Sequence, residues 1–185
     1  MINTMTKKEK LYFPEFFQGE KFKENYFEGW YFKHSNERYS ISFIAGISME
    51  KDNKHAFIQI ISNNFSEYIK YDFSEFSYSN NPFYIKIGDN YFSKDGISIN
   101  INKENIKVFG EIEYSKLISI RKNKSAPNIM GPFAYCNFLE CYHGVISLYH
   151  SLNGDLRVII ENKESIYRFS NDARIYRKRL GNKLS

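Results

Sequence analysis

The sequence predicts an all-β fold in which antiparallel strands form a barrel or a sandwich. Short stretches of alternating apolar and polar residues follow one another along residues 26–114, as half-buried strands require. Asn, Asp, Gly and Ser fill the stretches between them, which suits hairpin turns. Residues that favour sheets are abundant, since the chain contains 17 Phe, 15 Tyr and much Ile. No amphipathic helix longer than about two turns competes with this pattern.

The order of the patterns predicts three parts of the chain. Residues 1–25 form an N-terminal segment with little regular structure, residues 26–167 a β-domain, and residues 168–185 a basic tail. A basic connection at 121–130 separates a first group of strands from a second strand-rich region at 131–161. The strands expected in the first group are 26–33, 39–48, 55–62, 68–78, 83–87, 90–93, 97–102 and 105–114.

The distribution of charge argues against a nucleic-acid partner. The formal net charge of +5 lies entirely in residues 168–185, which contain six basic residues and one acid, Asp172. The rest of the chain is neutral and carries no RNA- or DNA-binding motif. No apolar run approaches the roughly 18 residues of a transmembrane helix and no signal peptide is visible, so we expect a cytoplasmic protein. No nucleotide-binding motif occurs, and we expect no cofactor.

The first motif that indicates chemistry is YFEGWYFK at residues 26–33. Side chains alternate along a strand, so Glu28, Trp30 and Phe32 should share one face. A carboxyl group between two large rings would be partly removed from water, a setting that suits a proton donor. The alternative is a carboxylate at the rim of the sheet that pairs with a cation.

The second motif starts at Gly131-Pro132-Phe133 and continues from Leu139 to Leu152, where it contains Glu140, Cys141, Tyr142, His143 and Gly144. A carboxylate and an imidazole among apolar residues could exchange a proton near neutral pH, if a bulge at Gly144 lets Glu140 and His143 meet. The alternative is a hydrogen-bonded core histidine. Cys141, His143 and His150 do not match a familiar zinc pattern, and we expect no metal.

Together these motifs resemble the tocopherol cyclase-like family, whose members carry a YFEGWYFK-type motif near the start. The resemblance runs from about Tyr26 to Leu156. Besides the two motifs, it includes Ser42-Phe43-Ile44 with Gly46-Ile47, and the strand from His55 to Ile60. It implies a lipocalin-like fold of two halves around an apolar cavity, of which this chain would be the first half.

The family resemblance also implies an activity and roles for individual residues. Plant and cyanobacterial members of the family close a chromanol ring from a prenylated hydroquinone, which needs a proton for the alkene, a dry aromatic pocket and capture of the cation by the phenol oxygen. Glu28 or Glu140 would be the acid, and His143 a base or an orienting group. The residues expected at the substrate are Trp30, Tyr31, Tyr142, His55 and Gln59.

Two other functions remain open from the sequence. The same aromatic cavity would serve a lipocalin-like carrier or sensor that binds a small apolar ligand without catalysis. The chain could also be a structural fragment whose open β-edge or apolar wall favours self-association. The expected partner is a small apolar or prenylated aromatic ligand, with peripheral contact to a membrane as a further possibility.

The last residues carry a pattern that predicts a frameshift near Ala173. Family members continue with a segment resembling Gly-Tyr-Ile-Glu-Lys-Asp-Trp-Gly-Thr-Ser-Phe-Pro. Codons for residues 174–185 can be chosen so that reading one base later encodes that segment. Sequencing the gene tests this expectation: the alternative frame should continue with family-like sequence, and an immediate stop codon in that frame would refute it.

Overall fold

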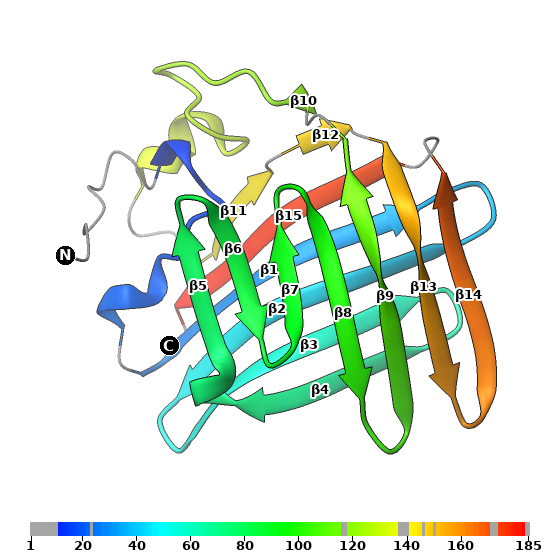
Figure 1. The fold of residues 1–185 in the computed structure, drawn as a ribbon. Helices are drawn as coiled ribbons and strands as arrows, with labels where there is room; N and C mark the ends of the chain where they lie inside the picture. The colour runs from blue at the N-terminus through cyan, green and yellow to red at the C-terminus, as the bar shows by residue number, and fades with distance from the viewer. Residues whose placement is uncertain are drawn as a thin grey trace.

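The computed structural model describes residues 11–22, 24–115, 118–136, 141–145, 147–149, 151–170 and 174–183. Side chains are described for all of these except 141–143, 147–149 and 174–183. Two large antiparallel sheets pack against each other, and Figure 1 shows the strands of one crossing behind those of the other. The prediction of an all-β, antiparallel sandwich is therefore confirmed.

The first sheet has six strands and contains the YFEGWYFK motif near its middle. Its strands β1 to β4 follow one another as hairpins, while β15 and β11 add to the other side of β1. In spatial order they are β11 (Cys141–Val145), β15 (Arg174–Lys183), β1 (Tyr26–Ser35), β2 (Ser40–Glu50), β3 (Asn53–Ser62) and β4 (Ser66–Asp72).

The second sheet has seven strands, of which five are consecutive in the chain. In spatial order they are β14 (Lys163–Ser170), β13 (Leu152–Ile160), β9 (Ile106–Tyr114), β8 (Gly96–Asn102), β7 (Asn90–Ser93), β6 (Phe83–Ile87) and β5 (Phe76–Asn80). Two short strands, β10 (Ile118–Ser119) and β12 (Ser147–Tyr149), form a separate pair. Three 3-10 turns, η1 (Gly19–Lys21), η2 (Phe73–Glu75) and η3 (Gly131–Tyr135), lie outside the sheets.

The core lies between the two sheets and consists mainly of aromatic and isoleucine side chains. Phe92 of β7 packs against two rings of the opposite sheet, with centroids 5.2 Å from Phe32 and 6.4 Å from Phe43. The largest side chains that are fully buried include these three and Trp30, Phe169, Ile41, Ile47, Ile58, Ile60 and Ile85. These side chains fill the space between the sheets.

The predicted single strand at 68–78 is wrong, because the 3-10 turn η2 (Phe73–Glu75) interrupts it. Asp72 caps this turn: its Oδ1 accepts a hydrogen bond from the backbone N–H of Ser74 at 2.8 Å. In return the N–H of Asp72 donates to Oε1 of Glu75 at 3.0 Å, which completes a capping box. The turn carries the chain from the six-stranded sheet into the seven-stranded sheet.

The C-terminal residues form strands where a basic tail is expected. The expected boundary at 167/168 falls inside β14, which ends at Ser170. Residues 174–183 then form β15, which pairs with β1 on one side and with β11 on the other. Both sides of β1 are therefore hydrogen-bonded, by β15 and by β2.

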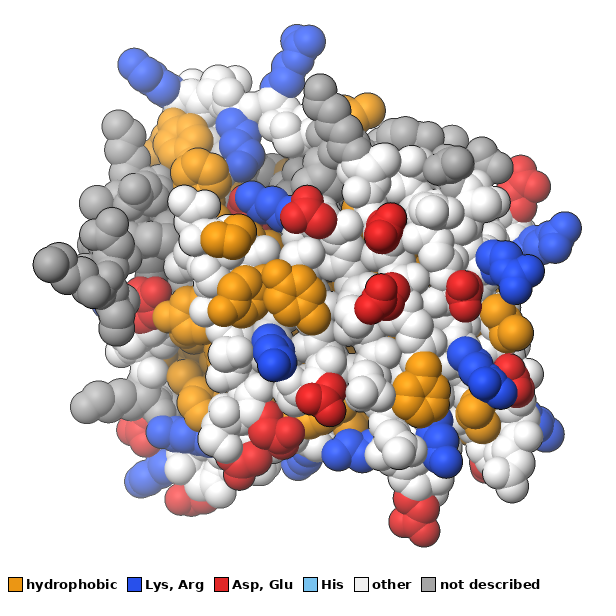
Figure 2. All heavy atoms as spheres, in the orientation of Figure 1, with side chains coloured by type: hydrophobic (Ala, Val, Ile, Leu, Met, Phe, Trp, Pro, Cys, Tyr) orange, Lys and Arg blue, Asp and Glu red, His pale blue; other side chains and the backbone are white. Residues whose placement is uncertain are grey.

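The visible face of the molecule carries charges of both signs. Figure 2 shows acidic and basic side chains interspersed over the outer face of the seven-stranded sheet, with apolar side chains between them. No helix within the described part of the chain is long and apolar enough to cross a membrane.

Shortening Phe92 tests the packing of the two sheets. We expect Phe92→Ala to lower the free energy of unfolding by about 3–5 kcal/mol, because the cavity left between the sheets cannot collapse fully. Urea denaturation measures the loss. The matched control is Phe133→Ala, since the Phe133 side chain is 64% exposed and its removal should leave stability nearly unchanged. Equal effects of the two substitutions would contradict the packing described here.

Candidate functional site

Strand β1 directs its side chains alternately to the two faces of the six-stranded sheet. Glu28, Trp30 and Phe32 all point into the sandwich, on the same face, as the alternation predicts. Glu28 is completely buried at 0% exposed, which excludes the rim position considered as the alternative. The YFEGWYFK motif therefore places a carboxyl group inside the protein.

The Glu28 carboxylate holds the N-terminal segment against the sheet. Its Oε2 accepts hydrogen bonds from the backbone N–H groups of Gln18 at 3.0 Å and Gly19 at 3.1 Å. The hydroxyl of Tyr26 donates to the same oxygen at 2.6 Å. A buried carboxylate that accepts several hydrogen bonds is compensated for its loss of water. These contacts support a positioning role for Glu28.

A second buried carboxylate, Glu15, lies beside Trp30. The Trp30 indole Nε1–H donates to the backbone oxygen of Glu15 at 2.7 Å. The Glu15 side chain, itself buried, forms an ion pair with Lys94 at 2.7 Å between Oε1 and Nζ. Burial lowers the pKa of the nearby Lys122, while the charge of Glu15 opposes that shift. Glu15 was not expected from the sequence, although, like Glu28, it is an acid within an aromatic stretch, between Pro14 and Phe16.

Three of the other expected binding residues, Tyr31, His55 and Gln59, lie on the opposite face of this sheet. Strand pairing places Tyr31, Ile44, Gln59 and Tyr68 in one row across β1, β2, β3 and β4. His55 lies on the same face, two residues before Phe57. The hydroxyl groups of Tyr31 and Ser42 form a hydrogen bond with 3.1 Å between their oxygens. Trp30 and Tyr31 thus do not share a wall, because neighbouring residues of a strand face opposite ways.

Three stacked rings cross this outer face, and we call them the aromatic ladder: Phe27, Phe57 and Tyr68. Ring centroids are 5.5 Å apart for Phe27 and Phe57, and 5.0 Å apart for Phe57 and Tyr68, with interplanar angles of 11° and 19°. Gly46 makes this stacking possible, because a Cβ there would lie 2.6 Å from the Phe57 ring. Phe57, in the middle of the ladder, is buried, whereas Tyr68 at its end is 46% exposed.

His55 forms a hydrogen-bonded pair with Tyr68 at the end of the ladder. Its Nδ1 lies 2.8 Å from the backbone oxygen of Asn53, and its Nε2 lies 2.8 Å from the Tyr68 hydroxyl. Burial, reinforced by the charge of Glu50, raises the pKa of Tyr68. The ladder therefore combines an apolar stacking surface with a phenol and an imidazole at one end.

The second motif is described only in part. Glu140 lies outside the described residues, and so does His150. Tyr142 and His143 belong to β11, where they pair with Gly181 and Leu180 of β15, but their side chains lie outside the description. No group of three or more His, Cys, Asp or Glu that could hold a metal ion occurs within the described part of the chain.

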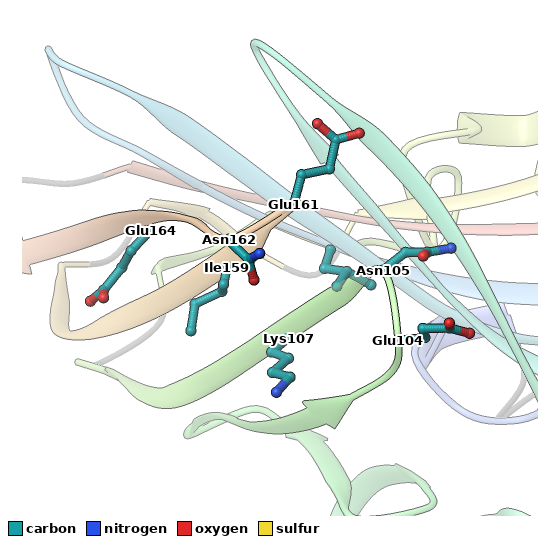
Figure 3. A pocket seen from close by; sticks show the side chains of 8 residues that line it. Glu104, Asn105, Lys107, Ile159, Glu161, Asn162 and Glu164 are labelled. Atoms are coloured by element: carbon teal, nitrogen blue, oxygen red, sulfur yellow. The ribbon is translucent and has the colours of Figure 1, made fainter.

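A surface depression lies at the far ends of the hairpins β8–β9 and β13–β14. Figure 3 shows its lining side chains, which are mostly polar or charged. The lining residues are Glu104, Asn105, Ile106, Lys107, Ile159, Glu161, Asn162 and Glu164. It contains none of the residues that the sequence singles out, and its polar lining does not suit an apolar ligand.

The solved structures that are similar to this chain include two crystal structures of CghA, one of them with Sch210972. The structure with Sch210972 has a TM-score of 0.54 and 8% sequence identity, and the match covers 86% of this chain and 46% of that one. The other has a TM-score of 0.55 and 8% identity, with 87% and 47% covered. This chain therefore spans about half the length of the CghA chains, and the likeness supports a lipocalin-like antiparallel fold.

Comparisons of the sequence itself find no relative. No protein-family model matches the chain. No curated protein matches it either.

Replacing the buried carboxylate tests its positioning role. We expect Glu28→Gln to lower the free energy of unfolding by about 1–3 kcal/mol, because three donors lose a charged acceptor. Thermal and urea denaturation measure the change. Glu113→Gln, on the exposed outer side of β9, is the control and should change stability by less than about 0.5 kcal/mol. If the two variants are equally stable, Glu28 does not hold the N-terminal segment.

Proposed function

We propose that this chain is the ligand-binding half of a tocopherol cyclase-like protein and that it binds a small prenylated aromatic molecule against the aromatic ladder. The ladder carries the proposal: three parallel rings, Phe27, Phe57 and Tyr68, lie across one face of the six-stranded sheet. Planar aromatic ligands stack on such surfaces.

The packing of the sandwich favours the outer face over the interior as the binding surface. Phe32, Phe43 and Phe92 meet between the sheets, so that space is already filled by the protein's own side chains. On the outer face, Ile44 lies beside Tyr31 in the same row, and both are only half-buried. An isoprenoid chain needs an apolar surface of this kind next to the ring.

The polar groups at the ladder suit the head of a hydroquinone. Gln59 pairs across the strands with Tyr68, and His55 is hydrogen-bonded to the same tyrosine. A few convergent polar groups on an otherwise apolar surface orient a ligand of this type. The resemblance of residues 26–33 to the family motif supports the same ligand class independently.

A non-catalytic carrier is the second candidate, and the position of Glu28 favours it. Glu28 lies on the inner face, opposite the ladder, where it accepts hydrogen bonds from Gln18, Gly19 and Tyr26. A carrier would hold the ligand without turnover, whereas a cyclase would release a chromanol. Incubation with a geranyl-substituted hydroquinone, followed by product analysis, separates the two.

Calorimetric titration with geranylhydroquinone tests the binding surface. We expect Tyr68→Ala to weaken binding about tenfold, which corresponds to the loss of one aromatic stacking contact of roughly 1.4 kcal/mol. The matched control is Tyr91→Ala, because Tyr91 is 39% exposed and lies on the other sheet beside Tyr84, with ring centroids 5.4 Å apart. This control should bind like the unaltered chain.

Two results would contradict the proposal. One is the absence of binding by the unaltered chain at ligand concentrations up to its solubility limit. The other is an equal loss of affinity in Tyr68→Ala and Tyr91→Ala, which would indicate unspecific adsorption to exposed tyrosines.

A further inference from the structure

We infer that Tyr68 and His55 form a proton relay that binds a phenolic hydroxyl of the ligand and accepts its proton. The inference rests on the proposed function, since it assigns roles at the same aromatic ladder. It adds a catalytic residue, Tyr68, and a new role for His55 as the group that acts through Tyr68.

The surroundings of His55 determine which of its nitrogens carries the proton. The backbone oxygen of Asn53 can only accept a hydrogen bond, so Nδ1 of His55, 2.8 Å away, must be protonated. In the neutral imidazole Nε2 is then an acceptor. Tyr68 therefore donates its hydroxyl proton to Nε2 over 2.8 Å.

Because the Tyr68 hydroxyl donates its hydrogen to His55, the lone pairs of its oxygen can accept a hydrogen bond from another donor. The hydroxyl is held at the end of the ladder, and the tyrosine side chain is partly exposed while His55 is buried behind it. The raised pKa of Tyr68 keeps the phenol protonated, so that it remains a donor to His55. A ligand hydroxyl beside the ladder meets an oriented acceptor.

The relay provides a balanced path for the proton released when a phenol oxygen closes a ring. The phenolic proton moves to the Tyr68 oxygen while the Tyr68 proton moves to Nε2 of His55. The electron pair of the former O–H bond forms the new C–O bond to a prenyl carbon that an acid from solution has made cationic, so the proton gained by the prenyl group balances the proton passed to His55. Tyrosine is regenerated, and His55 becomes an imidazolium whose Nδ1–H still donates to Asn53.

Selectivity for a free hydroxyl tests the inference. The probes are geranylhydroquinone and its dimethyl ether, which has the same ring and chain but no O–H. We expect the unaltered chain to bind the hydroquinone about three- to tenfold more tightly, as one hydrogen bond provides. Tyr68→Phe keeps the ring of the ladder and should bind both probes equally. Tyr91→Phe, on the other sheet, should retain the preference.

The outcomes separate this inference from the proposed function. If neither probe binds, the proposed function fails. If both bind equally to the unaltered chain, or if Tyr68→Phe keeps the preference, the relay is refuted while ligand binding stands.

Nitrogen NMR of His55 gives a test that needs no ligand. At neutral pH the unaltered chain should show a protonated Nδ1 and an unprotonated Nε2. In Tyr68→Phe the Nε2 resonance should shift, because that nitrogen loses its hydrogen-bond donor. The opposite tautomer, or an unchanged Nε2 resonance in the variant, would overturn the assignment.

Discussion

The alternation of side chains along β1 is the constraint on which both faces of the six-stranded sheet depend. Because β1 is hydrogen-bonded by β2 and β15, its residues have no freedom to rotate, and each is committed to one face. Glu28 and Trp30 are thereby directed inward, where they bind the N-terminal segment through Gln18, Gly19 and the backbone of Glu15. Phe27 and Tyr31 are directed outward. A shift by one residue would exchange these two sets.

Glycine at position 46 connects this constraint to the aromatic ladder. The residue lies opposite Gly29 of β1 and Phe57 of β3, so the centre of the outer face lacks two side chains. The Phe57 ring occupies that space and reaches Phe27 on one side and Tyr68 on the other. Backbone without a Cβ thus determines where the rings lie, and the rings in turn determine where Tyr68 presents its hydroxyl to His55.

Much of the fold could be predicted from the sequence, whereas the site could be predicted only in part. Period-two alternation located strands such as β6 and β7 correctly, and it placed Glu28 with Trp30 on one face. The turn at 73–75 was missed because its capping box lies within a stretch of mixed aromatic and polar residues that resembles a single strand. The ladder was missed for a different reason. It depends on the register between β1, β3 and β4, which one strand pattern does not specify.

The position of β15 has a consequence for the order in which the molecule assembles. During folding, β1 has only β2 as a neighbour until residues 174–183 pair along its other side. Joining segments that lie this far apart in the sequence costs conformational entropy before any contact offsets it, so such topologies fold slowly. During synthesis on the ribosome, one edge of β1 therefore stays unpaired until residues 174–183 have emerged, and chaperones would protect the nascent protein during that interval.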